Sequence, residues 1–177
     1  MSAAYNLDAA IRKVPDFPRP GVLFYDITGI LADTGAFTYC IDEMVSRYES
    51  ASLDAVVAIE SRGFLFAAPF ALRLGLPLVL ARKKGKLPGE TVSRTFQLEY
   101  GQDTLEIKRV DLQEKRRMLI VDDLIATGGT IEAAAEIIAG EGSTVAGVFC
   151  VIGLPFLNYR RLLGNTPVTT LIDYNGE

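Results

Sequence analysis

Short apolar runs of strand length alternate along the chain with segments of helical length, and this pattern constrains the fold more than any other feature. The run from Ala55 to Ile59 is entirely apolar and mostly β-branched, which predicts a strand buried on both faces. Further strands are predicted at residues 78–80, 118–121, 145–152 and 168–172, and helices at 36–49, 63–74 and 129–139. Buried strands that alternate with helices predict an α/β fold with a central, mainly parallel, twisted sheet flanked by helices.

The first 34 residues do not follow this pattern. Residues 7–14 predict a short helix with Leu7, Ile11 and Val14 on one face. Three prolines and a glycine within residues 15–21 predict a stiff, extended loop, and residues 22–25 predict a short strand. We therefore expect residues 1–34 to form a small N-terminal hood beside a core of residues 35–177.

Composition excludes several classes of protein. The chain has 177 residues and a net charge of −4, which fits one globular domain and gives no basic field for nucleic-acid binding. It contains no histidine, so a histidine general base and the usual zinc ligand sets are excluded. Cys40 and Cys150 lie in apolar stretches and suit buried free thiols in a reducing cytosol. No stretch reaches the ~18–20 apolar residues that span a bilayer, so we expect a cytoplasmic protein without nucleic-acid or membrane partners.

A loop suited to phosphate follows the strand predicted at 118–121. Its backbone amides can point at one anion, because glycine permits the necessary conformation and the next helix begins there. Hydroxyl groups supply further donors, and the loop lacks both the lysine of a Walker A loop and the spacing of a dinucleotide turn. The residues predicted to hold the 5′-phosphate of an activated sugar are Ala126, Thr127, Gly128, Gly129 and Thr130.

Two adjacent carboxylates, Asp122 and Asp123, precede this loop. As hydrogen-bond acceptors they suit the two hydroxyls of a ribose, bound directly or around a magnesium ion. A simpler interpretation is a strand that ends at a helix N-terminus, with aspartates favourably placed at its dipole. The pair together with the Thr-Gly-Gly-Thr run favours binding of a ribose and its phosphate.

The segment Val121–Thr130 resembles the phosphoribosyl-pyrophosphate signature of type I phosphoribosyltransferases. Four more segments resemble the adenine phosphoribosyltransferase family in the same order and at similar spacing, namely residues 17–24, 60–64, 82–89 and 98–101. The similarity covers nearly the whole chain and weakens after about Ile152. It implies the type I phosphoribosyltransferase fold, the substrates adenine and phosphoribosyl pyrophosphate, and a homodimer. Mg²⁺ is expected as cofactor and held mainly by substrate, since the sequence shows no all-protein metal cage.

A second anion site is predicted at Ser61 and Arg62, which follow the first buried strand. The guanidinium fork of Arg62 suits phosphate oxygens, and the resemblance implies that this turn holds pyrophosphate after a cis peptide at Glu60. The alternative is an arginine that caps a helix or pairs with Glu60. The basic run 82–86 on its own would suit a solvated surface loop. The resemblance favours Arg82 and Lys86 of this run as pyrophosphate contacts. Lys83 and Lys84 suit surface positions or the site of an adjacent subunit.

Residues 85–103 predict a hinged β-ribbon, because an alternating run is bounded by glycines, and a flexible lid is expected at about 84–104. Glu99 lies near the end of that run. A carboxyl group above the base could manage the proton of the purine nitrogen, and by resemblance Glu99 takes this catalytic role while Tyr100 helps to close the lid. The alternative is an ordinary exposed strand glutamate.

The stiff loop of the hood can present the backbone atoms of Leu23 and Tyr25 to the edge of a purine, while Phe24 stacks on its face. The alternative is that these residues only pack in the core. The chain departs from the family at Tyr25, where a basic residue is usual, and at Gly153 and near Phe156, where acidic residues are usual. These departures leave open a transferase for hypoxanthine, xanthine or guanine, and a non-catalytic regulator that senses phosphoribosyl pyrophosphate is a rival from another class.

Overall fold

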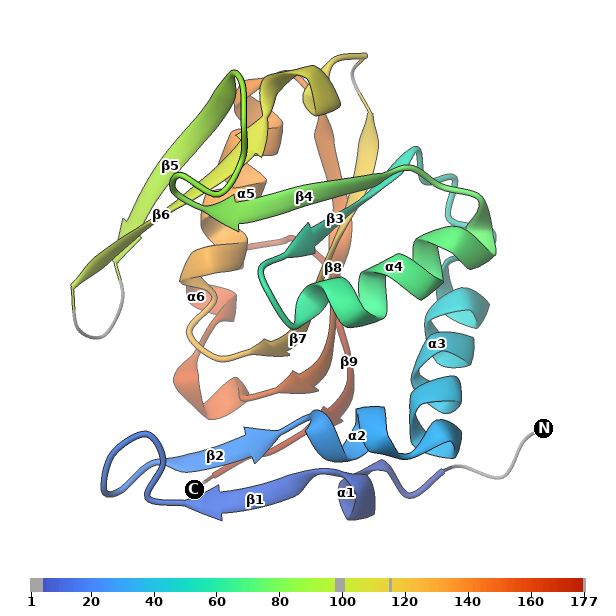
Figure 1. The fold of residues 1–177 in the computed structure, drawn as a ribbon, viewed down its shortest axis with the longest axis vertical. Coiled ribbons are helices and arrows are strands. Elements are labelled where there is room, and N and C mark those ends of the chain that lie inside the picture. The colour runs from blue at the N-terminus through green and yellow to red at the C-terminus, as the bar shows by residue number, and fades with distance from the viewer. Residues whose placement is uncertain (1–4, 98–100, 115, 177) are drawn as a thin grey trace.

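The computed structural model describes residues 5–97, 101–114 and 116–176. At its centre lies a seven-stranded sheet with the strand order β5-β6-β4-β3-β7-β8-β9 (Figure 1). The five strands that pair in parallel are β3 (Ala55–Ile59), β4 (Leu78–Lys83), β7 (Arg117–Ile125), β8 (Thr144–Gly153) and β9 (Val168–Asp173). The predicted α/β fold with a central, mainly parallel sheet is confirmed.

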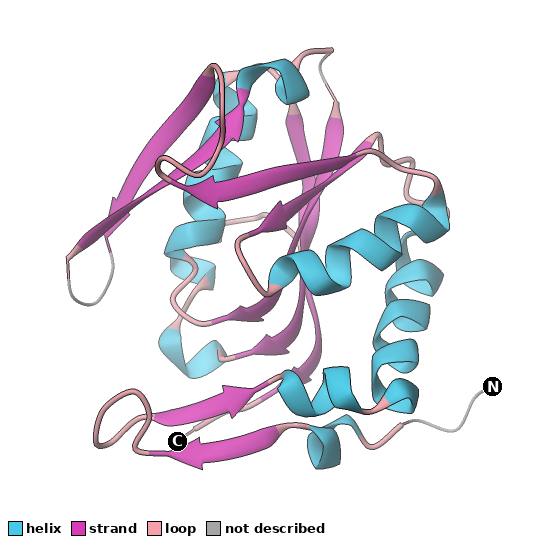
Figure 2. Cartoon of the chain, viewed as in Figure 1, coloured by secondary structure: helices cyan, strands magenta, loops and turns pink. Residues whose placement is uncertain are grey.

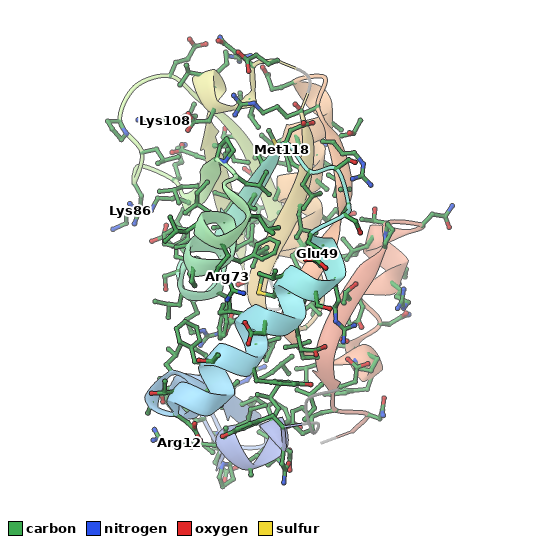
Figure 3. All side chains as sticks on the ribbon, turned by 90° about the vertical axis from the view of Figure 1, so that its right-hand side faces the viewer. Arg12, Glu49, Arg73, Lys86, Lys108 and Met118 are labelled. Carbon is green, nitrogen blue, oxygen red and sulfur yellow. The ribbon has the colours of Figure 1, made fainter. Side chains whose placement is uncertain are left out.

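Helices cover both faces of this sheet (Figure 2). On one face lie α3 (Thr34–Tyr48) and α4 (Gly63–Leu74), and Figure 3 shows α3 on the outside of this layer. On the other face lie α5 (Gly129–Gly140) and the short α6 (Arg160–Leu163). Each layer encloses its own buried apolar cluster, because the apolar strands present side chains to both faces. Single 3₁₀ turns are formed by η1 (Arg109–Leu112) and η2 (Pro155–Leu157).

The predicted β-ribbon is confirmed and consists of β5 (Thr91–Gln97) and β6 (Gln102–Lys108), which pair antiparallel. β6 also pairs antiparallel with the end of β4, so the ribbon extends the main sheet. It reaches across the N-terminal half of α5 (Figure 1). The ribbon is therefore anchored to the core on two sides.

The first residues of the described chain form α1 (Leu7–Ala10), β1 (Arg12–Pro15), β2 (Leu23–Asp26) and α2 (Thr28–Ala32). The predicted helix over 7–14 is wrong beyond Ala10, because Val14 pairs with Phe24 in a two-stranded antiparallel sheet. Backbone pairing with a segment ten residues away outweighs the helical spacing of the apolar residues. Val14 is consequently exposed instead of packed on a helix face.

Residues near the end of the described chain hold this two-stranded sheet against the core. The rings of Tyr25 and Tyr174 are stacked with centroids 4.1 Å apart. The Tyr174 hydroxyl donates a hydrogen bond of 2.5 Å to Asp8, and the ammonium of Lys13 lies 5.1 Å from the centre of the Tyr174 ring. Strand β2 is thus fixed by a residue that follows β9.

In the described part of the chain, no helix combines the length and apolar character that crossing a membrane would require.

Candidate active site

The carboxyl ends of β3, β4 and β7 meet at one edge of the sheet, where a ligand site is expected in such folds. A cavity of about 320 Å³ lies there. Five residues predicted from the sequence come together in its wall, namely Ser61, Arg62, Asp122, Asp123 and Thr130. Glu60, Lys83 and Leu124 also line it. The peptide bond between Glu60 and Ser61 is cis, as the resemblance implied.

The predicted phosphate loop joins β7 to α5. Gly128 caps the helix in a left-handed conformation, with φ of +88°, which glycine adopts at little cost. A Cβ atom at Gly128 would lie 3.1 Å from the Cβ of Tyr159, so Tyr159 packs closely against the loop. The first turn of α5 leaves backbone N–H groups without helical partners, and a helix N-terminus of this kind favours negative charge nearby.

Strand β7 is longer than predicted, because Asp122 pairs with Cys150 and Leu124 with Ile152 of β8. The two aspartates therefore belong to the strand and do not follow it. Asp122 Oδ1 accepts the N–H of Asp123 at 2.8 Å. Burial and the neighbouring Asp123 charge raise the pKa of Asp122 well above its ordinary value.

Asp123 is only 4% exposed, and its Oδ2 lies 2.7 Å from Arg62 Nε. Burial raises the pKa of Asp123, and the Arg62 charge opposes this rise. Despite the short contact, the angle is unsuited to a hydrogen bond, and no group of the described residues donates one to Oδ2. Asp123 thus presents a buried acceptor atom at the wall of the cavity, and such an atom requires a donor.

The cations around this cavity are already paired with carboxylates. Arg82 donates to both oxygens of Glu60, at 3.2 and 3.0 Å, and the N–H of Lys83 donates to Glu60 at 2.9 Å. Although burial opposes ionisation, these bonds lower the pKa of Glu60. Glu60 therefore pairs with Arg82, whereas the sequence had suggested Arg62 as its possible partner.

Lys83 lines the cavity and lies 2.9 Å from Asp103, while the side chain of Lys86 is exposed and does not line it. Sequence reasoning favoured Lys86 over Lys83. The missed signal is the length of β4: the strand continues to Lys83, so this residue stands at the same sheet edge as the cavity. Arg82 also donates to the Lys86 carbonyl at 3.3 Å, which holds the basic loop together.

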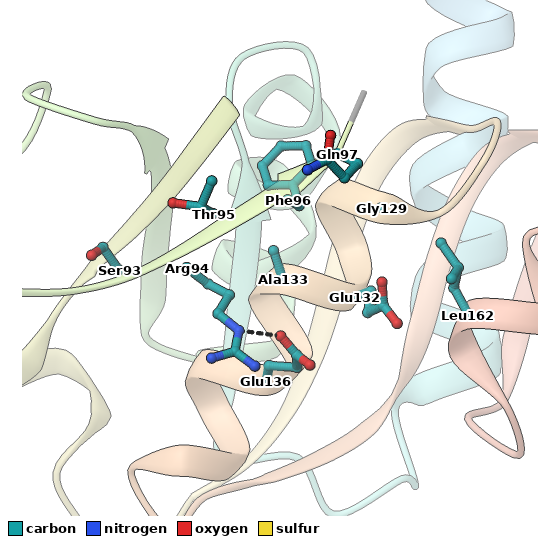
Figure 4. A pocket seen from close by; sticks show the side chains of 10 residues that line it. All are labelled: Ser93, Arg94, Thr95, Phe96, Gln97, Gly129, Glu132, Ala133, Glu136 and Leu162. Atoms are coloured by element: carbon teal, nitrogen blue, oxygen red, sulfur yellow. Dashed lines mark hydrogen bonds and ion pairs between the residues drawn. The ribbon is translucent and has the colours of Figure 1, made fainter. Parts of the chain in front are cut away.

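The ribbon touches the phosphate loop. A Cβ atom at Gly129 would lie 3.3 Å from the carbonyl oxygen of Gln97, the last described residue of β5. A groove of about 680 Å³ runs between β5 and α5, and an ion pair between Arg94 and Glu136 crosses it at 2.5 Å (Figure 4). Glu99 and Tyr100 lie outside the described residues.

At the hood, Phe24 packs edge-on against Phe17, and the guanidinium of Arg62 lies 5.5 Å from the Phe24 ring centre. Strand β2 is therefore adjacent to the second anion site. Leu23 is partly exposed, whereas the Tyr25 side chain is buried against Tyr174.

Gly153 lies at the end of β8, where the family usually has glutamate. A Cβ atom there would lie 2.1 Å from Asp173 Oδ1 and 2.9 Å from the Thr170 methyl group. Asp173 itself accepts a hydrogen bond from the Thr170 hydroxyl at 2.8 Å. A carboxylate supplied by β9 thus occupies the space beside Gly153.

No group of three or more candidate metal-ligating side chains is found among residues 5–97, 101–114 and 116–176.

Comparison with known proteins agrees with this geometry. The phosphoribosyl transferase domain family matches residues 29–161. An adenine phosphoribosyltransferase of Treponema denticola is 56% identical over 171 residues, which cover 97% of this chain and 90% of the relative.

Solved structures give the same result. The adenine phosphoribosyltransferase of Thermoanaerobacter pseudethanolicus aligns with a TM-score of 0.91 and 44% identity, over 95% of this chain and 98% of that one. The Saccharomyces cerevisiae enzyme, solved in complex with an imino-altritol bisphosphate and adenine, aligns with a TM-score of 0.88 and 39% identity, over 94% and 96%. The fold and the resemblance predicted from the sequence are confirmed, and the chain belongs to the adenine phosphoribosyltransferase family of phosphoribosyl transferases.

Proposed function

We propose that this protein transfers the 5-phosphoribosyl group of phosphoribosyl pyrophosphate to adenine, which yields AMP and pyrophosphate. The observation that carries the proposal is the buried Asp123 oxygen, which accepts no hydrogen bond from the described residues and lines the same cavity as Thr130, Arg62 and Lys83. A ribose with a monophosphate on one carbon and a pyrophosphate on another suits this combination of acceptor and anion sites. The names of the relatives and the adenine bound to the yeast relative support the choice of base.

The proposed contacts follow the two ends of the sugar. The loop 126–130 holds the 5′-phosphate, and Asp122 and Asp123 accept the ribose hydroxyls. Ser61, Arg62, Arg82, Lys86 and Tyr100 hold the pyrophosphate, to which we add Lys83 because it lines the cavity. A base nitrogen attacks the anomeric carbon from the opposite face, and the bond to the pyrophosphate oxygen breaks with inversion. The backbone at Leu23 and Tyr25 reads the base edge, and Phe24 stacks on the base.

Mg²⁺ is proposed to bind as a complex with phosphoribosyl pyrophosphate. Arg62, Arg82 and Lys83 each already face a carboxylate, so the pyrophosphate end offers little unbalanced positive charge to a polyanion. A divalent cation bound to phosphoribosyl pyrophosphate supplies that charge, and oxygen ligands from the substrate suit it. Asp122 and Asp123 would be the protein groups that contact such an ion or its waters.

Glu99 is proposed to hydrogen-bond to the base and to take the proton that the attacking nitrogen loses. Glu99→Gln keeps the shape and removes the basic oxygen, so turnover should fall while the Michaelis constant for phosphoribosyl pyrophosphate changes little. Steady-state kinetics with both substrates varied measures the two constants separately. Normal turnover in this variant would remove Glu99 from the mechanism.

A homodimer is proposed, with helix α4 in the interface. Leu65 and Leu72 lie on one face of α4 and are 43% and 83% exposed, and Leu78 at the start of β4 is 37% exposed. Exposed apolar side chains on one face of a helix favour contact with a second copy of the chain. Because α4 begins directly after Arg62, such an interface would adjoin the second anion site.

Leu72→Glu should therefore shift the protein from dimer to monomer, since it places a charge in the centre of that face. Sedimentation velocity at several concentrations measures the change. Val110→Glu is the matched control, because Val110 is 63% exposed on η1, away from α4, and its replacement should leave the dimer intact. Equal behaviour of the two variants would remove α4 from the interface.

A cytoplasmic location is also proposed, because both cysteines are buried free thiols of the kind kept in reducing compartments.

The deciding experiment is a coupled assay of pyrophosphate release with adenine, hypoxanthine, guanine and xanthine. Adenine should give the highest kcat/KM, and AMP should form in equal amount to pyrophosphate. If hypoxanthine were turned over as well as adenine, the choice of base would be wrong. Binding of phosphoribosyl pyrophosphate without nucleotide formation from any base would point to a regulator.

A further inference from the structure

The end of strand β4 is tied to the ribbon by an ion pair. Lys83 Nζ lies 2.9 Å from Asp103 Oδ2, and the other oxygen of Asp103 accepts the N–H of Thr104 at 2.8 Å. The hydrogen bond from Lys83 lowers the pKa of Asp103, although burial opposes this. Asp103 is therefore an oriented carboxylate whose partner is the lysine at the proposed pyrophosphate site.

Lys83 stands between two cavities. It lines the cavity of about 320 Å³ at the sheet edge and an adjoining one of about 130 Å³, and Asp103 lines only the smaller. Glu60 and Thr130 line both, so the two spaces share a wall. With a long flexible stem, the Lys83 ammonium can turn from Asp103 toward an anion in the larger cavity.

This pair differs from the two other cation–carboxylate pairs of the site. Arg62 and Arg82 are held by Asp123 and Glu60, which belong to core strands or their ends and are at most 14% exposed. Asp103 belongs to the ribbon and is 23% exposed, and the Lys83 side chain is 61% exposed. Exposed ion pairs are weak, so a polyanion can displace Asp103 from Lys83 and the pair can re-form afterwards.

We propose that Asp103 is a positioning residue that competes with pyrophosphate for Lys83 and thereby promotes pyrophosphate release. The inference rests on the proposed function, in which pyrophosphate is the leaving group. Its physical basis is the negative charge that Asp103 keeps beside Lys83, which lowers the attraction of this site for an anion. The ribbon thus contributes a counter-charge to the site in addition to any covering role.

Calorimetric titration with pyrophosphate and Mg²⁺ tests the proposal without any turnover. Asp103→Asn should bind pyrophosphate about three- to fivefold more tightly, the upper part of the range that an exposed ion pair allows. Product inhibition by pyrophosphate should strengthen by the same factor, and Asp103→Glu should restore the affinity. In a Lys83→Ala background, Asp103→Asn should produce little or none of this increase in pyrophosphate affinity. Unchanged or weaker binding by Asp103→Asn, or an undiminished gain without Lys83, would overturn the proposal.

Glu136→Gln is the matched control, because it breaks the ion pair that ties the same ribbon to α5 through Arg94. It should leave pyrophosphate affinity unchanged. An equal gain in this variant would mean that a loosened ribbon, and not the Asp103 charge, sets the affinity. Failure of the proposed function is distinguishable, since it appears as absent AMP synthesis by the unaltered protein.

Discussion

Gly128→Ala is expected to lower kcat/KM for phosphoribosyl pyrophosphate about a hundredfold, the loss that a misplacement of roughly 1 Å can cause. The backbone at this position has a φ of +88°, which costs an L-residue about 1–2 kcal/mol. The added Cβ would also lie 3.1 Å from Tyr159, behind the loop. Both effects move the amides proposed to bind the 5′-phosphate, so the measured change should fall mainly on the Michaelis constant for the sugar.

Gly142→Ala separates these two effects. Gly142 has a φ of +81°, but a Cβ there meets no atom within 4 Å. Both variants should unfold at a lower temperature, whereas only Gly128→Ala should lose activity. Thermal melts and steady-state kinetics on the two proteins decide the matter. Unimpaired kinetics in Gly128→Ala would show that this loop does not bind the phosphate.

The second expected result is a gain of stability at the expense of activity. Asp122→Asn should raise the melting temperature of the free protein at pH 8 by about 2–4 °C, the shift expected for a gain of ~1 kcal/mol. Asn keeps an oxygen for the N–H of Asp123 and removes a charge that burial and Asp123 disfavour. The same change should lower kcat/KM for phosphoribosyl pyrophosphate about tenfold or more, because hydrogen bonds to charged acceptors are strong.

The pH dependence of this gain has a defined sign. The pKa of Asp122 is raised in the folded protein, so the folded state binds more protons than the unfolded state between the two pKa values. Stability contributed by the protonated form is complete below about pH 4 and is lost as pH rises through the raised pKa. The advantage of Asp122→Asn should therefore grow from pH 4 to pH 8.

Asp123→Asn provides the contrast. It removes the partner of Arg62, so no comparable stabilisation is expected, while the Michaelis constant for the sugar should rise. Melting curves from pH 4 to pH 9 for the three proteins test both statements. If Asp122→Asn and the unaltered protein had the same melting temperature at every pH, the proposed repulsion between the Asp122 and Asp123 carboxylates would be contradicted.

Much of the fold could be predicted because single segments determine it. Residues 55–59 and 63–74 form a strand and a helix with the predicted bounds, since an apolar β-branched run and a long apolar segment each allow one structure in this context. Strand β7 was predicted too short, because two carboxylates resemble the end of a strand. Their strand continues because its backbone pairs with β8, and such long-range pairing cannot be predicted from the local sequence.

The composition of the site could be predicted better than its connections. Asp123 and Arg62 were both identified, yet their contact joins segments 61 residues apart and depends on how β3 and β7 align. Lys83, Asp103 and Tyr174 were not among the predicted site residues, and their contacts also join separate segments: Lys83 pairs with Asp103, and the Tyr174 ring fixes the strand that carries Phe24. Such pairings are properties of the assembled sheet edge, so the sequence predicted several of the chemical groups but not their partners.

The paired cations described above also bear on inhibitor design. If Arg62, Arg82 and Lys83 bind pyrophosphate as proposed, a phosphonate or bisphosphonate mimic that carries only negative charge would have to separate them from their carboxylates without compensation. A mimic with a built-in ammonium near the sugar would offer Asp122 and Asp123 a counter-ion of its own. Zwitterionic sugar analogues should accordingly depend less on added magnesium than polyanionic ones.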